Sequence, residues 1–337
     1  MKILKPLSFI YGAALKADKA FTDAKKLNKP VISIGNITWG GAGKTPIVIE
    51  TSKFLLSKKI KPAVLTRGYG RKTKTPVLLQ NGAKKVSPAI AGDEPLLISK
   101  SVPKASVIVG AKRYKNALTF KKKANAKAYI LDDGFQHWKI KRALDIVCVN
   151  AANPFGNLEL IPAGILREPV IALKRAGIVI ITNADMISGK ELKKLIKKIP
   201  CKNIALTKYE LSGFTKPDLQ TSFDIKKLKN KKVFALSALG FTKGFENSLA
   251  KAKIKLAGSI SLRDHNKYEK NTFSHILKTA GKDAYFITTA KDAVKINALA
   301  SADFKAKTAV LTVKPKFILG RKVWEKAILN ALTPRSF

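Results

Sequence analysis

The sequence predicts an α/β protein with a doubly wound, mostly parallel β-sheet and a second, smaller α/β domain. Short apolar runs rich in Val and Ile alternate with segments of helical periodicity, as at residues 31–34, 62–65, 128–131 and 178–182. This alternation is typical of parallel sheets whose strands are connected by helices. The chain has 337 residues, 46% of them hydrophobic, which is enough for about two domains that each bury a core.

The first apolar run leads into a glycine-rich turn. Residues 31–34 read Val-Ile-Ser-Ile, a β-branched run typical of a buried strand. The turn ends in Lys44-Thr45, and residues 47–56 can form a helix with one apolar side. A strand, a glycine loop, Lys-Thr and a helix occur in this order in a phosphate-binding P-loop. The sheet is therefore expected to be of the P-loop NTPase type.

This glycine loop predicts that the chain binds ATP and Mg²⁺. Backbone N–H groups can surround phosphate oxygens, Lys44 can reach the terminal phosphates, and the Thr45 hydroxyl can ligate Mg²⁺. The usual pattern has a glycine where this chain has Thr38, and an ordinary glycine-rich turn is the alternative. The predicted nucleotide-binding residues are Thr38, Gly40, Gly41, Ala42, Gly43, Lys44 and Thr45.

Further candidate residues follow later strands, because loops at the carboxyl ends of strands line the sites of α/β sheets. Arg67 follows the run 62–65 and is a candidate anion contact, although it can equally be a solvated surface residue. The run 128–131 ends at Asp132, and an aspartate there is what Mg²⁺ coordination opposite a P-loop requires. Asp93 opens a further predicted helix, which it can also simply cap.

The composition is strongly basic, with a formal net charge of +43. Lysine outnumbers arginine and is spread along the whole chain, whereas base reading and bidentate phosphate binding favour arginine. We therefore expect no nucleic-acid partner and favour an anionic membrane surface or an anionic lipid. The two cysteines, Cys148 and Cys201, indicate neither a disulfide framework nor a cysteine metal site, which fits a reducing cytosol.

The N-terminal segment can be interpreted in several ways. A basic start and Ala13-Ala14 partly resemble a cleaved signal peptide, but a nucleotide-binding loop some twenty residues later needs the cytoplasm. A membrane-spanning helix needs about 20 apolar residues, and Lys16, Asp18 and Lys19 come too soon for that. An amphipathic helix fits best, and it can lie in a membrane interface or pack on the protein's own core. Its expected apolar face is Ile3, Leu7, Ile10, Ala14, Ala17 and Phe21.

The expected domain organisation has three parts. Residues 1–25 form the amphipathic interfacial helix, residues 26–206 the P-loop core, and residues 207–337 a second α/β domain with a C-terminal helix that returns toward the core. Residues 204–223 are strand-like, polar and turn-rich, which suits a linker.

Several motifs follow one another along the chain, and two of them, DDGFQH and the LREP element, are far more specific than the P-loop alone. The motifs are GNITWGGAGKTP at 35–46, TRGYGR at 66–71, GDEPLL at 92–97, DDGFQH at 132–137 and GNLELIPAGILREP at 156–169, followed by Asp-His at 264–265 and KDAVK at 291–295. In this order they resemble the lipid A 4′-kinase family, tetraacyldisaccharide 4′-kinase. Members of that family also lack the first P-loop glycine, so Thr38 agrees with the resemblance.

The resemblance implies a reaction and a location. ATP would phosphorylate the 4′-hydroxyl of a tetraacylated glucosamine disaccharide 1-phosphate, a lipid A precursor, and residues 26–206 would be the kinase core. The protein would be a peripheral enzyme on the cytoplasmic face of the inner membrane, and we expect a monomer. An anionic lipid substrate held in a bilayer would account for both the N-terminal helix and the basic surface.

The resemblance also implies residue roles. Lys44 would hold the β- and γ-phosphates, and Asp93 would be the base that takes the proton of the 4′-hydroxyl, paired with His265. If the two lie in different domains, this pair would form only on domain closure. The implied metal-side residues are Thr45, Asp132, Gln136 and Glu168. The implied substrate-side residues are Arg67, Tyr69, Asp133 and His137.

Structural alternatives exist for three of these residues. His265 can be a surface histidine, His137 can be a core histidine, and Asp133 can hold its loop without touching the metal.

Two other function classes compete with a lipid kinase. A P-loop GTPase or ATPase switch, or a metallochaperone-type protein, would need a guanine-reading Asn-Lys-x-Asp loop, and residues 182–185 have Ala184 in place of the lysine. A nucleic-acid-binding ATPase would bind DNA or RNA with a steep salt dependence.

Overall fold

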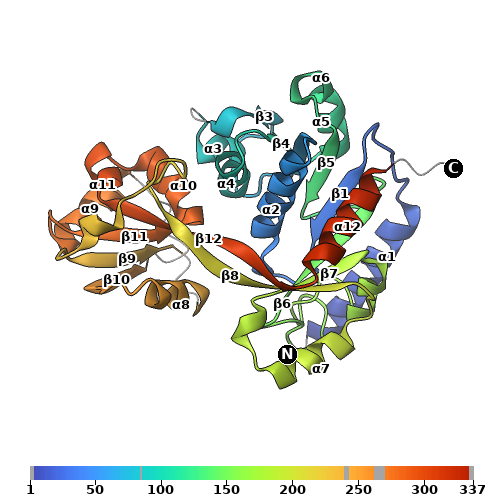
Figure 1. Ribbon diagram of the computed structural model, residues 1–337. Coiled ribbons are helices and arrows are strands. Elements are labelled where there is room, and N and C mark those ends of the chain that lie inside the picture. Colours follow the sequence, from blue (N-terminus) through green and yellow to red (C-terminus); the bar gives the residue numbers. More distant parts are fainter. Residues whose placement is uncertain (1–3, 84–85, 239–242, 262–269, 334–337) are drawn as a thin grey trace. The chain divides into compact units, whose positions relative to one another are not determined.

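The computed structural model describes residues 4–83, 86–238, 243–261 and 270–333, and it divides into two compact units. The first consists of Met1–Arg67, Lys104–Tyr209 and Pro315–Phe337, and the second of Gly68–Pro103 and Glu210–Lys314. One grouping differs from the expected organisation, because residues 68–103 belong to the second unit. The C-terminal helix α12 (Arg321–Leu332), which was expected to return toward the core, groups with the first unit (Figure 1).

The first unit is built on a parallel sheet with the order β8-β7-β6-β1-β5-β2-β4. Its central strand is the one that precedes the glycine loop, so the loop leaves the middle of the sheet. The predicted α/β, P-loop-type fold is confirmed. The strands are β1 (Val31–Gly35), β2 (Pro62–Thr66), β4 (Ser106–Val109), β5 (Ala128–Asp132), β6 (Leu144–Asn150), β7 (Ile178–Thr182) and β8 (Ile204–Thr215).

Helices cover both faces of this sheet. On one face α2 (Lys44–Ser57) packs against β1, β2 and β5, and α12 packs against β1 and β6. The ring centres of Phe54 on α2 and Trp324 on α12 lie 5.1 Å apart. The other face carries η3 (Val170–Arg175) and α7 (Gly189–Lys198), which begins with a capping box between Ser188 and Glu191. The remaining helices of the unit are α1 (Lys5–Phe21), α5 (Arg113–Thr119), α6 (Lys121–Ala124) and η4 (Ala184–Met186).

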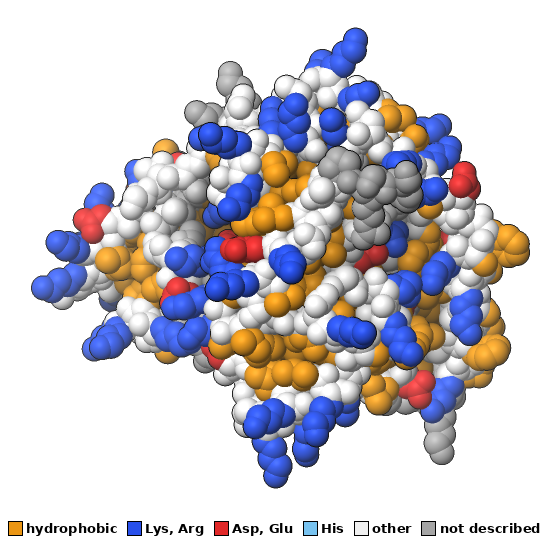
Figure 2. Space-filling model, turned by 45° about the vertical axis from the view of Figure 1, so that its right-hand side comes forward, with side chains coloured by type: hydrophobic (Ala, Val, Ile, Leu, Met, Phe, Trp, Pro, Cys, Tyr) orange, Lys and Arg blue, Asp and Glu red, His pale blue; other side chains and the backbone are white. Residues whose placement is uncertain are grey.

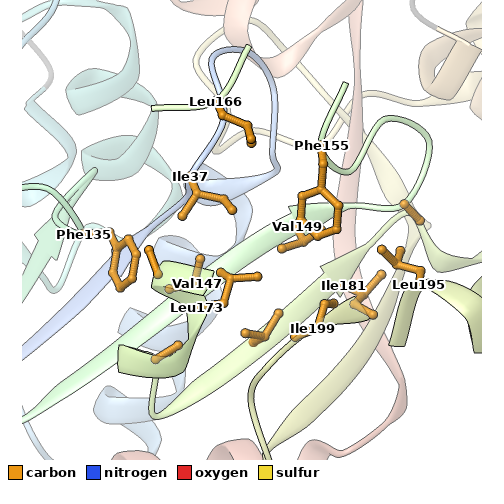
Figure 3. Packing of buried hydrophobic residues seen from close by; sticks show 14 of the residues in the cluster. Ile37, Phe135, Val147, Val149, Phe155, Leu166, Leu173, Ile181, Leu195 and Ile199 are labelled. Atoms are coloured by element: carbon orange, nitrogen blue, oxygen red, sulfur yellow. The ribbon is translucent and has the colours of Figure 1, made fainter. Parts of the chain in front are cut away.

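The core on the second face extends into the loops beyond the sheet. Val147, Val149 and Ile181 project from β6 and β7 toward Leu195 of α7 (Figure 3). The same cluster includes Ile37 of the glycine loop, Phe135 and Leu166, all at most 1% exposed. Loop residues that are packed into a core are held in place, because core side chains tolerate little displacement.

The strands of the second unit are also parallel and have the order β10-β9-β11-β12. Two hydrophobic clusters pack on them, centred on Ile287 and Phe286 of β11, so the predicted second α/β domain is confirmed. Strand-like sequence was expected at 204–223, and β8 occupies its first twelve residues; β8 and β12 each begin in one unit and end in the other along the chain. The elements are β9 (Val233–Ser237), β10 (Gly258–Ser261), β11 (Tyr285–Thr289), β12 (Thr308–Leu319), α8 (Lys243–Lys251), α9 (Lys270–Ala280), α10 (Ala290–Leu299) and α11 (Ala302–Ala306).

The segment 68–103 contributes short elements to the second unit. They are β3 (Val77–Leu79), η2 (Asn81–Ala83), α3 (Pro88–Ala91) and α4 (Asp93–Ser101). Helix α10 packs against α3 and α4. This packing brings the GDEPLL and KDAVK motifs together, although they lie some 200 residues apart in the sequence.

Candidate active site

The glycine loop connects β1 to α2 and has the backbone of an anion-binding turn. Gly40 (φ 111°) and Gly43 (φ 76°) adopt left-handed conformations that favour glycine. A side chain at Gly43 would also collide with the Tyr209 hydroxyl. Helix α2 begins at Lys44, directly after Gly43. The amides of its first turn, which have no partner within the helix, therefore face the loop.

Side chains and backbone from neighbouring segments hold this loop. Thr182, at the end of β7, donates its hydroxyl to the Ala42 carbonyl at 3.1 Å. Thr38 forms an antiparallel bridge with Leu166 and is only 7% exposed. The amide of Trp39 donates to the Ile165 carbonyl at 2.6 Å. The position that is usually glycine is therefore paired, strand-like backbone, which explains why threonine is tolerated there.

Lys44 meets the aspartate loop that follows β5. Its Nζ lies 3.3 Å from Oδ1 of Asp133 and 3.0 Å from Oδ1 of Asn36. The parallel pairing of β1 with β5 places Ile34 beside Asp132, so both strands end at the same edge of the sheet. The glycine loop and the strand-terminal aspartates thus face one site, as the motif order predicted.

Asp132 and Asp133 have different environments. Asp132 is 4% exposed and accepts a hydrogen bond of 2.9 Å from the Thr66 hydroxyl at the end of β2. Asp133 has a left-handed backbone (φ 49°), and its carboxylate accepts from Nη1 of Arg167 at 3.0 and 3.3 Å. Burial alone would raise the pKa of Asp133, but the charges of Lys44, Arg167 and Arg113 outweigh it and hold the pKa below its ordinary value.

Gln136 and Glu168 form a second polar group behind this loop. Nε2 of Gln136 donates to Oε1 of Glu168 at 2.8 Å and to the Asn36 carbonyl at 3.0 Å. Nη2 of Arg175 donates to both Glu168 oxygens at 2.8 and 3.0 Å. The guanidinium of Arg175 also lies 4.4 Å from the centre of the Phe135 ring. The charge of Glu168 is thus balanced by Arg175, a residue to which the sequence analysis assigned no role. The metal-side role of Glu168 remains a prediction.

His137 and Arg67 line a strongly basic cavity of about 830 Å³. Burial, reinforced by the charges of Arg113, Arg142, Lys139 and Arg67, lowers the pKa of His137 to about 4, so its imidazole is neutral at physiological pH. Within the described part of the chain its Nε2 has no hydrogen-bond partner. The cavity wall carries six cationic side chains and two carboxylates: Lys25, Arg67, Lys112, Arg113, Lys115, Lys139, Asp18 and Asp23.

The remaining candidates belong to the second unit. Asp93 is the first residue of α4, and its Oδ2 lies 3.2 Å from Nζ of Lys295 on α10. The neighbouring Glu94 pairs with Lys291 at 3.4 Å. Tyr69 is 88% exposed. His265 lies outside the described residues, so its pairing with Asp93 remains a prediction.

Sequence reasoning missed several residues that the fold brings to the first unit's site. Asn36, Thr66 and Arg113 each stand directly after a strand or close to its carboxyl end, and the rule that selected Asp132 could have selected them. Arg113 is 7% exposed, and its Nη1 donates to the Asp133 carbonyl at 3.1 Å. Arg167 lies inside the LREP motif, but only the fold shows that it contacts Asp133.

Helix α1 exposes the residues of its predicted apolar face that the structure describes. Leu7, Ile10 and Phe21 are 52, 62 and 90% exposed, whereas Ser8 is buried. The alternative in which the predicted apolar face packs on the protein's own core is therefore wrong. No helix among residues 4–83, 86–238, 243–261 and 270–333 has the length and hydropathy needed to cross a bilayer.

The parallel sheet, the glycine loop and the lysine that faces strand-terminal aspartates define a P-loop nucleotide-binding protein. Comparisons with known proteins define the family more narrowly. The chain belongs to the family of tetraacyldisaccharide-1-P 4′-kinases, whose model matches residues 1–333. The family resemblance expected from the motifs is confirmed.

Individual relatives agree with this assignment. Tetraacyldisaccharide 4′-kinase of Anaeromyxobacter sp. (strain K) is 32% identical over 98% of this chain and 90% of its own length. The protein of the same name from Geobacter metallireducens is 36% identical over 82% of this chain and 81% of its own. A crystal structure of the "apo" form of LpxK from Aquifex aeolicus in complex with ATP has a TM-score of 0.81 and 30% identity, and the match covers 98% of this chain and 99% of that one.

Proposed function

We propose that this protein is an ATP-dependent kinase that phosphorylates the 4′-hydroxyl of a tetraacylated glucosamine disaccharide 1-phosphate in lipid A biosynthesis. The observation that carries the proposal is the approach of Lys44 to Asp133 at the end of β5, in a chain that matches the kinase family over nearly its whole length. Members of the family that bear this name match the chain at 32–36% identity.

The glycine loop and its surroundings provide the groups that phosphoryl transfer needs. The loop amides and Lys44 would hold the β- and γ-phosphates of ATP, which orients the γ-phosphate and offsets its charge. Thr45 and Asp132 would hold Mg²⁺, with Gln136 and Glu168 on the same side. Such a donor set suits this ion, because Mg²⁺ is usually bound by one or two carboxylates, phosphate oxygens and water. When bound, it would neutralise charge on the transferred phosphoryl group.

Asp93 is the proposed base for the sugar hydroxyl, with His265 as its partner. A carboxylate within hydrogen-bond reach of an acceptor hydroxyl can take its proton during phosphoryl transfer. The ion pair with Lys295 keeps the Asp93 side chain on the α10 side of α4 in the second unit. His265 would pair with Asp93 and raise the basicity of its carboxylate.

The basic cavity beside the aspartate loop suits the phosphate of the substrate. Gln136 and Arg113 connect its wall to the site of Lys44 and Asp133. Its other end reaches Phe21 and Thr22, where α1 ends. Six cations would hold a phosphomonoester well, and we propose that the 1-phosphate of the disaccharide binds here, with Tyr69 as a further substrate contact.

The surface supports peripheral binding to an anionic membrane. The exposed apolar residues of α1 would enter the interface, and lysines would contact acidic headgroups. Lys and Arg side chains are scattered across the face seen in Figure 2 and do not form one stripe on it, unlike the lining of a nucleic-acid groove. We propose that the protein acts as a monomer on the cytoplasmic face of the inner membrane.

The decisive experiment measures ATP consumption with and without the disaccharide 1-phosphate lipid in detergent micelles. We expect lipid-dependent ADP formation, with the new phosphate on the 4′-oxygen by mass spectrometry and NMR. A switch GTPase would instead prefer GTP and hydrolyse it without the lipid. A preference for GTP would refute the kinase proposal, and so would nucleotide hydrolysis that does not depend on the lipid.

A further inference from the structure

The motif GNLELIPAGILREP contributes only Glu168 to the proposed chemistry, yet it lies between α1 and the phosphate-binding loop. Its residues 159–167, here called the bridging segment, contact both. All three elements belong to the first unit.

On one side, the bridging segment is hydrogen-bonded to α1. The Ser8 hydroxyl donates to the Leu160 carbonyl at 2.8 Å and accepts from the Ala163 amide at 3.0 Å. One turn further along α1, the Tyr11 hydroxyl donates to the Arg167 carbonyl at 3.1 Å. Ser8 is 5% exposed, although it is a polar residue on a helix whose apolar residues face outward. A buried hydroxyl that both donates and accepts is a specific attachment point.

On the other side, the same segment pairs with the loop that precedes Gly40. The Trp39 amide donates to the Ile165 carbonyl at 2.6 Å, and the Arg167 amide donates to the Ile37 carbonyl at 2.7 Å. Leu166 is packed into the core against Ile37, as Figure 3 shows. The Arg167 side chain continues to Asp133, which faces Lys44.

These hydrogen bonds attach α1 to the bridging segment, as does the ion pair between Lys5 and Glu159 (2.8 Å), whereas apolar packing beneath the helix is incomplete. A cavity of about 540 Å³ lies between Gly12, Ala13 and Leu15 of α1 and Leu160, Ile171 and Ala172 of the body of the unit. A helix that leaves such a space gains less from burial. Its hydrogen bonds then matter more for where it sits.

We propose that Ser8 and Tyr11 are positioning residues for phosphoryl transfer: they hold the bridging segment, and through it the phosphate-binding loop, in the geometry that binds ATP. The two sides of α1 thus have separate tasks. Its outward residues serve the membrane, and its inward hydroxyls serve the nucleotide site. The inference rests on the proposed function only in taking ATP as the ligand of the loop.

The test compares inward and outward variants of α1 in the full-length protein. ATP affinity is measured by calorimetry without lipid, and the KM values for ATP and lipid are then measured separately. Ser8→Ala and Tyr11→Phe should weaken ATP binding about two- to fivefold each, and together about tenfold, because each removes a hydrogen bond. Their KM for lipid should change less than twofold. Leu7→Ser and Ile10→Ser should show the opposite pattern.

Thermal unfolding of each variant separates positioning from misfolding. A double variant that keeps a cooperative transition and binds ATP weakly supports the inference. Unchanged ATP affinity in the Ser8→Ala/Tyr11→Phe variant would overturn it, as would equal loss of ATP affinity in Leu7→Ser. If the unmodified protein itself bound no ATP, the proposed function would fail instead, so the two failures are distinguishable.

Discussion

Nζ of Lys44 lies 3.3 Å from Oδ1 of Asp133, and the same carboxylate accepts two contacts from Arg167. One carboxylate therefore holds two cations at the edge of the sheet where β1 and β5 end. Because the pKa of Asp133 is lowered overall, this arrangement persists in mildly acidic solution. It keeps the ammonium group of Lys44 beside the aspartate loop.

Replacing Lys44 tests this arrangement. Lys44→Ala removes the charge that would stabilise the transferred phosphate, and we expect turnover to fall by roughly a thousandfold, in the range measured for single electrostatic groups. The measurement is ADP formation at saturating lipid. Lys53→Ala, an exposed lysine on the same helix, is the matched control and should retain normal turnover. Comparable rates in the two variants would contradict the role of Lys44.

The base is tested by Asp93→Ala. Turnover should be lost while ATP still binds, because Asp93 belongs to the second unit and the glycine loop to the first. Titration calorimetry with ATP and a product assay give the two readings. Asp303→Ala, which removes an exposed carboxylate of the same unit, serves as the control. Near-normal phosphorylation by Asp93→Ala would reject the assignment.

The basic cavity predicts selectivity for a phosphorylated disaccharide. Lys115→Gln and Lys139→Gln remove two wall cations, and together they should raise KM for the 1-phosphate substrate about tenfold, since a close charge pair at a surface is worth up to about 1 kcal/mol. KM for the same lipid without its 1-phosphate should stay nearly constant. An equal rise for both substrates would indicate that the cavity holds something other than this phosphate.

The ion pair between Arg175 and Glu168 should contribute to stability. Arg175→Met leaves a carboxylate whose side chain is only 5% exposed without its cation, and we expect a loss of about 3 kcal/mol in the free energy of unfolding. The thermal midpoint should fall by several degrees. The neighbouring exposed Lys174→Met should leave it unchanged. A midpoint for Arg175→Met within one degree of the unmodified protein would show that Glu168 does not need this partner.

His137 predicts a pH dependence of stability. Its pKa is lowered from 6.5 to about 4, first by burial and then by nearby cations, so the unfolded chain binds a proton more readily than the folded protein. The protein should therefore lose stability as pH falls from about 6.5 to 4. His137→Gln, which cannot be protonated, should show a flatter decline in thermal midpoint over this window. Identical curves would mean that His137 makes no contribution.

The fold class, the glycine loop and the strand-terminal aspartate were predictable from short stretches of the chain. The glycine loop, the strand before it and Asp132 are local patterns, since β-branched runs, left-handed glycines and strand-terminal carboxylates act within a few residues. Thr38 stands in this loop where the usual pattern has glycine, and its part in nucleotide binding stays a prediction. The pairing that explains it, with Leu166 more than a hundred residues later, was not predictable.

What depended on long-range packing could be seen only in the folded chain. Periodicity marked the apolar residues of α1 but not the side they face, because hydrogen bonds of Ser8 and Tyr11 to a distant segment orient the helix. Arg175 acquires its role by meeting Glu168 and Phe135, and residues 68–103 join the second unit because α4 packs on α10. Sequence patterns report the conformation of neighbours along the chain, whereas partners in space are set by how whole elements pack.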